Sequence, residues 1–278
     1  VYTTRTHDSL KISNGKWCWW SRNIGGRSAL DYLIKVRGMT LPEAVLQING
    51  QAAVTPVSQK VQETSEPKKL LLPEKNENND RVIAYLMGRG IHREIIDYCI
   101  RTNRLYESRD YHNTVFVGFD RHGVSKYATL RGTFGKRFMG EVNGSDKHFS
   151  FSIPARNECS KLHLFESAID LLSYGTLELL SGRDWRQDFC LSLAGIYLPK
   201  KIIEESTPPA ALMQYLKDFP QIKEIALHLD NDTAGRLAAK AIQTILPPAY
   251  AVSDEPPERG KDYNDYLKIV LRIRQQQE

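Results

Sequence analysis

The chain has 278 residues, of which 41% are hydrophobic and 26% are charged, and its formal net charge is +5. This composition is typical of a globular protein and excludes the collagen-like, disordered and disulfide-scaffold classes. No apolar run approaches the ~18–20 residues of a membrane span, and the first residues lack the apolar core of a signal peptide. We therefore expect a cytoplasmic protein with free thiols and no membrane partner.

Basic and acidic residues are unevenly distributed along the chain. Lys and Arg outnumber Asp and Glu in residues 1–70 and 81–159, whereas acidic residues are in excess in residues 160–278. A basic front and a mildly acidic back suit a protein that holds a polyanion with one part and carries a carboxylate site in another.

Residues 1–157 are predicted to form a small domain, a linker and a subdomain, in that order. Residues 1–49 are predicted to form a small domain, and residues 50–78, which are polar and rich in Pro, Ser, Gln and Glu, are predicted to be a linker. Residues 79–157 begin with a helical pattern and continue with a β-hairpin around a turn at 121–123. This order predicts an α+β subdomain.

Residues 160–270 alternate between strands and helices. Apolar runs at 161–166, 189–194, 224–230 and 249–252 predict strands, and helices are predicted between them. Units of ~25–35 residues in this order predict a small parallel sheet with flanking helices, which is an α/β fold.

The most informative segment for chemistry is LDNDTAG, residues 229–235. Asp230 and Asp232 follow a buried strand, two residues apart, so both leave the carboxyl edge of the sheet on the same side. Two like charges so close repel each other unless a cation lies between them, and hard oxygen ligands select Mg²⁺ or Mn²⁺. The alternative is that Asp232 only caps the following helix.

Two further acidic segments are predicted at the same edge. Glu166 ends the strand at 161–166, and Asp262 and Asp265 follow the last strand, next to Lys261. Glu166 is a candidate metal ligand, and Asp262 and Asp265 are additional candidates. The alternative for each acid is that it stabilises a helix N-terminus.

A glutamate after one strand and D-x-D-x-x-G after a later strand resemble the Toprim domain, which occurs in DnaG-type primases, topoisomerases and some nucleases. The resemblance implies that Glu166 is a general acid/base and that Asp230 and Asp232 bind magnesium, with Gly235 as the motif glycine. The Toprim glutamate is usually followed by glycine, whereas Ser167 follows here, which leaves a close backbone approach at this point in doubt.

The resemblance extends upstream, to primase-core and mobile-element Toprim proteins of the DUF3991 type. YLMGRGIHREIIDYCI (85–100) resembles the opening of the DnaG-type catalytic core, and VFVGFDRHGVSKYATLRGT (115–133) resembles its strand–turn–strand element. The resemblance and the basic character of these segments imply phosphate contacts, because Arg and Lys dominate such contacts. The nucleic-acid or nucleotide-binding candidates are Lys126, Arg131, Lys136, Arg137, Lys147 and Lys261.

Residues 1–49 resemble the latter half of the primase CHC2 zinc ribbon in a degenerate form. Only Cys18 remains where the ribbon carries cysteines, and a structural zinc site needs four ligands, so we expect no zinc. Trp17, Trp19 and Trp20 have two interpretations: they stack on bases, or they pack a small core that has lost its metal.

The function implied by the resemblance is primase-like, Mg²⁺-dependent nucleotidyl transfer in the replication or transfer of a mobile genetic element. The expected partners are single-stranded DNA and nucleoside triphosphates, with a replicative helicase or relaxosome protein as a further candidate. Two alternatives stay open. One is a nuclease that uses the same carboxylates, and the other is a non-catalytic accessory protein that binds single-stranded DNA.

Overall fold

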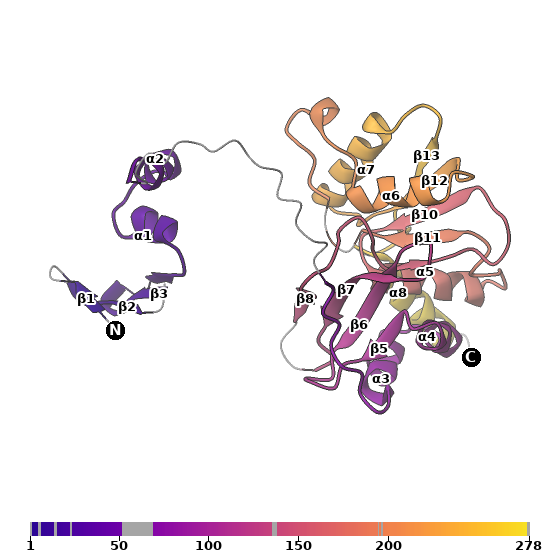
Figure 1. Ribbon diagram of the computed structural model, residues 1–278. Coiled ribbons are helices and arrows are strands. Elements are labelled where there is room, and N and C mark those ends of the chain that lie inside the picture. Colours follow the sequence, from indigo (N-terminus) through magenta and orange to yellow (C-terminus); the bar gives the residue numbers. More distant parts are fainter. Residues whose placement is uncertain are drawn as a thin grey trace. The chain divides into compact units, whose positions relative to one another are not determined.

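The computed structural model describes residues 2–4, 7–13, 16–22, 24–51, 69–134, 138–193, 195 and 197–276. The chain divides into two compact units, residues 1–66 and 67–278 (Figure 1). None of the helices in these described ranges is long and apolar enough to cross a membrane.

The first unit is a four-stranded antiparallel sheet followed by two helices. The strands lie in the order β1 (Tyr2–Thr4), β2 (His7–Ser13), β3 (Lys16–Trp19) and β4 (Ile24–Gly26), and the short helix η1 (Trp20–Arg22) lies between the last two. Helices α1 (Ala29–Lys35) and α2 (Leu41–Gln51) follow.

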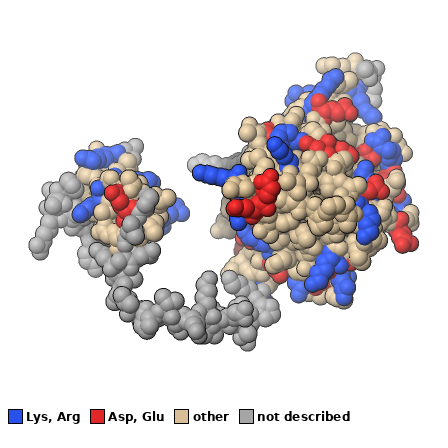
Figure 2. All heavy atoms as spheres, turned by 90° about the horizontal axis from the view of Figure 1, so that it is seen from above, with Lys and Arg blue, Asp and Glu red and all other residues tan. Residues whose placement is uncertain are grey.

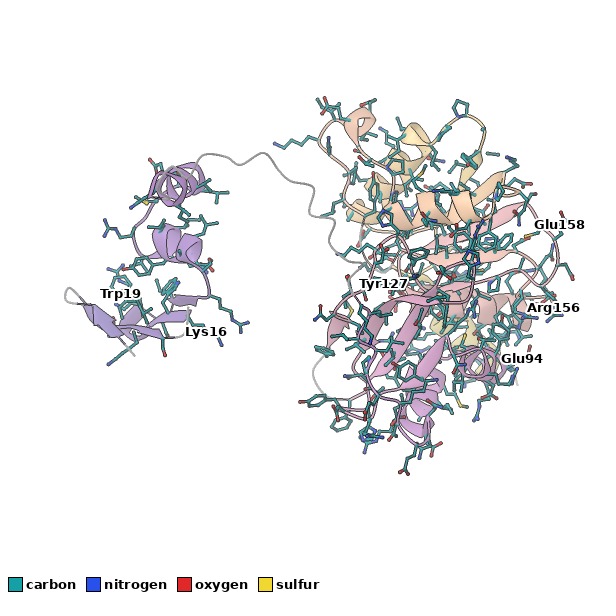
Figure 3. The ribbon with its side chains drawn as sticks, viewed as in Figure 1. Lys16, Trp19, Glu94, Tyr127, Arg156 and Glu158 are labelled. Atoms are coloured by element: carbon teal, nitrogen blue, oxygen red, sulfur yellow. The ribbon has the colours of Figure 1, made fainter. Side chains whose placement is uncertain are left out.

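The core of this unit is built on two tryptophans. Trp17 and Trp19 are buried with Leu10, and Tyr32 of α1 packs against them. Trp19 is labelled in Figure 3. The rings of Trp17 and Tyr32 meet edge to face, with centroids 5.7 Å apart. Of the two interpretations of these tryptophans, packing of a small core is therefore the one that the structure supports for Trp17 and Trp19.

The second unit opens with two helices and an antiparallel sheet. Helices α3 (Asp80–Gly88) and α4 (Arg93–Arg101) precede β5 (Leu105–Glu107), β6 (Thr114–Phe119), β7 (Ser125–Arg131) and β8 (Met139–Glu141), which pair in that order. The predicted hairpin is confirmed as β6 and β7. This part is the predicted α+β arrangement, and its strand β6 is buried along nearly its whole length.

Part of the predicted linker is packed rather than free. Most of its length, residues 52–68, lies outside the described residues. The amide of Leu71 donates to Asn143 O (3.0 Å), and that of Asn76 donates to Glu107 O (2.8 Å). Leu70 packs on the cluster around Tyr106 and so attaches this segment to the sheet, whereas Leu71 and Leu72 are exposed. The segment is polar overall, so its composition did not predict that Leu70 packs against the sheet.

A second sheet completes the unit, and its parallel strands were predicted. Its order is β13 (Ala251–Asp254), β12 (Glu224–His228), β10 (Lys161–Phe165), β11 (Phe189–Ser192) and β9 (Ser152–Ile153). The first four are parallel, and β9, from the segment before residue 160, pairs antiparallel with β11. The two central strands, β10 and β12, are almost entirely buried, as expected for a sheet covered on both faces.

Helices connect the parallel strands and cover the sheet. Between the strands lie α5 (Ala168–Leu180), η2 (Ile203–Glu205), α6 (Ala210–Asp218) and α7 (Thr233–Ile245), and α8 (Tyr263–Gln275) follows the last strand. One apolar cluster joins α3, α4 and α5 to the sheet, and a second joins α6 and α7 to its other face. This packing fixes the carboxyl edge of β10 and β12, where both strands pass into helices.

Candidate active site

Asp230 and Asp232 leave the sheet just after β12, as predicted. Asp230 is buried, and Asp232 caps α7 by accepting a hydrogen bond from the amide of Gly235 (2.9 Å). A Cβ on Gly235 would lie 2.0 Å from the carbonyl oxygen of Asp230. The D-x-D-x-x-G spacing is therefore explained by a helix cap and a close backbone approach, and the capping role of Asp232 leaves its other oxygen facing Lys261.

A lysine ammonium lies between the two carboxylates. Lys261 Nζ is 3.1 Å from Asp230 Oδ2 and 3.2 Å from Asp232 Oδ2. The loop that carries it is held in place because the amide of Asn231 donates to Lys261 O (2.7 Å). The carboxylates raise the pKa of Lys261, and the Gly235 amide and Lys261 lower the pKa of Asp232. The repulsion expected between the acids is therefore relieved by this lysine.

Glu166 follows β10 at the same edge, and its pKa is raised to about 7. Burial is the main cause, and the negative charges of Asp230 and Asp170 add to it. Asp170 is buried one turn into α5, and burial raises its pKa to about 7 as well. Ser167, at the position where Toprim domains usually have glycine, is the N-cap of α5 and donates to Asp170 Oδ2 (2.5 Å). A carboxyl with a pKa near neutrality can both take up and release a proton.

The pKa of Glu166 predicts a pH dependence of stability. Because the folded-state pKa lies above the value of 4.5 for an unperturbed glutamate, the unfolded chain loses this proton first as the pH rises. The contribution to stability is then fully present below pH 4.5 and declines up to about pH 7. Glu166→Gln should flatten this decline, measured by urea unfolding in metal-free buffer at several pH values. A profile with the parent's slope would contradict the raised pKa.

A cleft of about 550 Å³ lies between the β5–β8 sheet and the carboxyl edge of the parallel sheet, and Glu166, Asp170 and Asp230 line it, whereas Asp232 does not. Tyr127 of β7 lies on the side of the antiparallel sheet (Figure 3). Both basic and acidic groups converge on this space. The charged or strongly polar residues that line it are Arg89, Arg131, Glu141, Glu166, Asp170, Asp230, Lys261, Asp262 and Asn264.

The other predicted residues fall into four groups. Arg131 and Asp262 line the cleft, and Asp262 also caps α8 by accepting from the amide of Asp265 (2.7 Å). Lys126 pairs with Asp120 (3.7 Å), and Lys147 pairs with Glu141 (3.5 Å), which lines the cleft. Lys136 and Arg137 lie outside the described residues. Asp265 is exposed and is not a lining residue.

Arg89 and Asn264 are site residues that the sequence analysis did not find. Arg89 Nη1 donates to Asn264 Oδ1 (2.9 Å), and Asn264 Nδ2 donates to Arg89 O (2.9 Å) and to Ser173 Oγ (3.0 Å). Asn264 is buried, and its backbone amide donates to Asp170 Oδ1 (3.3 Å). Arg89 and Asn264 are 175 positions apart, so no local spacing connects them. Only the packing of α3 and α8 against α5 brings them together.

The residues present fit a divalent cation in part. Within the described ranges, no three Asp, Glu, His or Cys side chains are placed as a ready metal site. The Asp230 and Asp232 oxygens nevertheless converge on one point, at which the Lys261 ammonium now lies. Carboxylate oxygens are the donors that Mg²⁺ and Mn²⁺ prefer. Asp230 and Asp232 are therefore the residues that could hold such an ion if Lys261 moved away.

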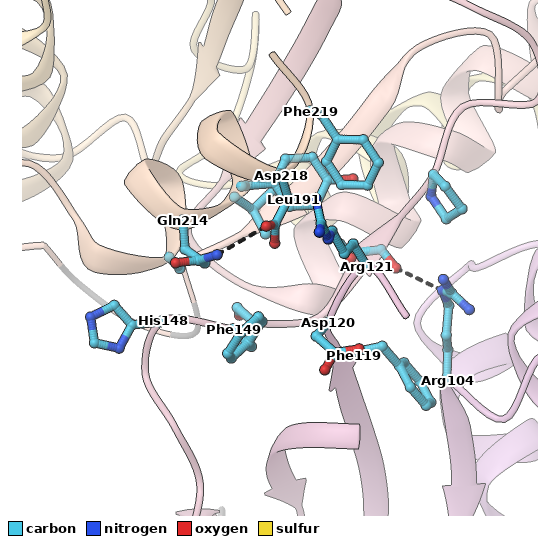
Figure 4. A pocket seen from close by; sticks show the side chains of 15 residues that line it. Arg104, Phe119, Asp120, Arg121, His148, Phe149, Leu191, Gln214, Asp218 and Phe219 are labelled. Atoms are coloured by element: carbon cyan, nitrogen blue, oxygen red, sulfur yellow. Dashed lines mark hydrogen bonds between the residues drawn. The ribbon is translucent and has the colours of Figure 1, made fainter. Parts of the chain in front are cut away.

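A second, smaller pocket lies where α6 approaches the turn between β6 and β7 (Figure 4). Its volume is about 40 Å³, which is room for one or two water molecules. Gln214 donates to Asp218 across its wall (3.0 Å), and Arg104 donates to Ser152 O (2.9 Å). It is too small for a nucleotide, so the larger cleft remains the candidate site.

Comparison with known families agrees with the fold. Residues 84–157 match the family described as "Protein of unknown function (DUF3991)", and residues 163–267 match the family described as Toprim-like. The chain therefore contains a Toprim-like domain preceded by a DUF3991 region, and the resemblance given by Glu166 and residues 230–235 is confirmed at the level of the domain. An uncharacterized protein of Bacillus anthracis is 25% identical over 307 residues, which cover 100% of this chain and 83% of that protein.

Primases are among the solved structures with a similar fold. The primase fragment of the bacteriophage T7 primase-helicase has 18% identity and a TM-score of 0.49, and the match covers 97% of this chain and 93% of that one. The zinc-binding and RNA polymerase domains of Aquifex aeolicus primase have 16% identity and a TM-score of 0.42, over 96% and 74% of the two chains. Because both TM-scores lie below 0.5, the assignment of the domain depends on the family matches alone.

Proposed function

We propose that this protein is a primase-like enzyme that carries out metal-dependent phosphoryl transfer on nucleic acid. The observation that carries the proposal is the convergence of Asp230 and Asp232 on one cation position, beside Glu166 and a cleft of about 550 Å³. The Toprim-like match of residues 163–267 supports a role in nucleic-acid chemistry.

Each residue of the site has a distinct role in this proposal. Asp230 and Asp232 would hold Mg²⁺ or Mn²⁺, which when bound supplies charge neutralisation for phosphate oxygens. Glu166, with a pKa of about 7, would accept the proton of the attacking hydroxyl group and return it to solvent. Arg131, on the opposite wall of the cleft, would bind a phosphate of the template or of a nucleoside triphosphate.

The network behind the carboxylates would keep the wall of the cleft rigid. Asn264 has hydrogen bonds to Arg89, Ser173 and Asp170, and it is buried. A fully bonded buried polar group of this kind fixes the geometry around it, because each partner loses a hydrogen bond if it moves. Arg89 would thereby present its guanidinium group to the cleft in a defined orientation.

The test is an assay of the full chain with labelled single-stranded DNA, ribonucleotides and Mg²⁺ or Mn²⁺. Products longer than the input, or newly made short oligonucleotides, would support nucleotidyl transfer. Shorter products would instead support the nuclease alternative, because the same carboxylates serve either direction of phosphoryl transfer. Neither product at any metal concentration, with intact binding of DNA, would support the accessory-protein alternative.

Binding of single-stranded DNA is expected to depend on salt through Arg131 and its basic neighbours in sequence. Removing one side chain that binds a phosphate should lower the slope of log K against log salt by about 0.7. Replacing Arg131, Lys136 and Arg137 together by Ala should therefore weaken binding and lower the slope by about 2. The measurement is fluorescence anisotropy of a labelled oligonucleotide between low and moderate salt concentrations.

A charge-matched control is needed because basic residues are widespread. Figure 2 shows Lys and Arg side chains interspersed with acidic ones over the visible face of the larger unit. Lys217, Lys223 and Lys240 are exposed residues of the parallel-sheet domain, and none of them lines the cleft. Their joint replacement by Ala removes the same charge and should leave the slope almost unchanged. An equal fall for both triple variants would show that net charge, not a defined groove, determines binding.

A further inference from the structure

Two aromatic side chains stand almost fully exposed at one end of the β5–β8 sheet. Tyr111, between β5 and β6, is 88% exposed, and Phe134, just after β7, is 91% exposed. Burying an aromatic side chain is strongly favourable. Two aromatic side chains exposed on neighbouring loops therefore indicate a surface that binds a partner.

The loop of Tyr111 is held in a strained conformation. Tyr111 and His112 have φ angles of 61° and 49°, in the left-handed region that residues other than glycine seldom adopt. The anchor is Glu107, which is buried and lies 2.6 Å from the His112 ring. Ser108 closes the loop by donating to Asp110 O (2.6 Å). The surrounding structure therefore fixes the outward position of Tyr111.

The two loops are tied to each other. Thr133 Oγ1 donates to His112 O (2.8 Å), which links the residues next to Tyr111 and Phe134. Phe138 lies across the glycines that flank the second loop, since a Cβ on Gly132 or Gly140 would lie 3.2 Å or 3.1 Å from its atoms. The aromatic rings are thus presented by one interconnected end of the sheet.

This aromatic end is continuous with the cleft. Arg131, Met139 and Gly140 line the cleft, and they flank the loop that carries Phe134. Exposed aromatic rings beside an arginine are a combination by which proteins bind single strands, with rings stacking on bases and the cation contacting phosphates. A purely apolar partner would not account for Arg131, which lines the cleft beside this loop.

We propose that Tyr111 and Phe134 form a stacking platform for the bases of a single-stranded nucleic acid whose backbone runs along Arg131 into the cleft. This inference rests on the proposed function, which it deepens by assigning the path of the single strand. The platform lies outside the carboxylate cluster and takes no part in phosphoryl transfer. It sets how tightly the strand is held and does not contribute to the chemistry.

The experiment compares two oligonucleotide probes, a thymidine 15-mer and a 15-mer of abasic sites, by fluorescence anisotropy with the full chain. Replacing Tyr111 and Phe134 together by Ala should weaken binding of the thymidine probe by about tenfold or more. The same variant should bind the abasic probe as the parent does, because phosphate contacts remain. Its salt slope should also equal that of the parent.

Two further variants separate stacking from a loss of structure. Tyr111→Phe with Phe134→Tyr keeps both rings and should restore binding of the thymidine probe. Val124→Ala, at the other end of the β6–β7 hairpin, removes an exposed apolar side chain and should have no effect.

Three results would overturn the inference without touching the proposed chemistry. They are parent-like binding by the double alanine variant, an equal loss for the abasic probe, and a change from dimer to monomer in sedimentation, which would make the rings a contact between copies. The proposed function fails separately, if the chain with all its aromatic residues shows no metal-dependent extension or cleavage.

Discussion

Replacing Asp230 and Asp232 together by Asn is expected to abolish phosphoryl transfer, with a decrease of about 10³-fold or more in rate. The two side chains are the acids whose oxygens converge on one cation position, and a bound metal typically supplies several kcal/mol of charge stabilisation in such reactions. The change keeps the size of both side chains. An asparagine in place of Asp232 could still accept the hydrogen bond from Gly235 and cap α7.

The same variant should no longer be stabilised by metal. A ligand that binds only the folded state adds about 2.7 kcal/mol at 100 times its Kd, which appears as a rise in Tm of the parent with Mg²⁺ or Mn²⁺. If the two acids only repelled each other, the variant would be more stable than the parent without metal, because the repulsion is removed. The ion pairs of Lys261 reverse that expectation, because the variant does not form them. We therefore expect no gain in Tm without metal.

Asp97→Asn is the matched control for this experiment. Asp97 lies on α4 and pairs with Arg93 at the surface (2.8 Å), away from the cleft. It should keep the parent's activity and metal response. Full metal-induced stabilisation in the Asp230 and Asp232 double variant would mean that these acids only serve the helix, and the accessory-protein alternative would then be preferred.

Gly235→Ala should be strongly destabilising, by roughly 3 kcal/mol in the free energy of unfolding. The new Cβ would lie 2.0 Å from Asp230 O and 2.8 Å from its carbonyl carbon, so backbone atoms rather than a flexible side chain must move. Because Asp230 is the residue displaced, activity should fall more than stability alone explains. Urea unfolding measures the loss of stability. The assay with labelled single-stranded DNA, ribonucleotides and metal, at a temperature where the variant is folded, measures the loss of activity.

Gly88→Ala tests whether this cost is specific. Gly88 is the last residue of α3, and a Cβ there would meet no atom within 4 Å. Alanine restricts the unfolded chain more than glycine does, so this variant should be neutral or more stable by about 0.4–1 kcal/mol. If both alanine variants were destabilised equally, the close approach of Gly235 to Asp230 would not be the cause.

The parallel sheet could be predicted from the sequence because its strands carry their own signals. Residues 225–227 of β12 are apolar, Leu229 follows, and helical periodicity begins immediately after Asp232. Glu166 and Asp230 could be placed at one edge because parallel strands end on the same side. These inferences needed only local pattern and one topological rule.

The partners of the site could not be predicted, because they depend on packing between distant segments. Lys261 was expected to contact phosphate, but its position between two carboxylates depends on the loop held by Asn231. Asn264 and Arg89 meet only because α3 and α8 pack against α5. The strained loop of Tyr111 likewise depends on a carboxyl group, Glu107, that looks like an ordinary surface acid in the sequence.

The position of Lys261 has a consequence for the order of events in the cleft. If Asp230 and Asp232 held a dication, the Lys261 ammonium group could not stay between them and would have to leave. The released lysine would remain in the lining of the cleft without its ion pairs to Asp230 and Asp232, and it could then bind a phosphate. Binding of metal and binding of a nucleotide would then favour each other to the same extent, by thermodynamic reciprocity. Lys261 would thus occupy the cation position when no metal is bound and would bind a phosphate of the substrate when metal is bound.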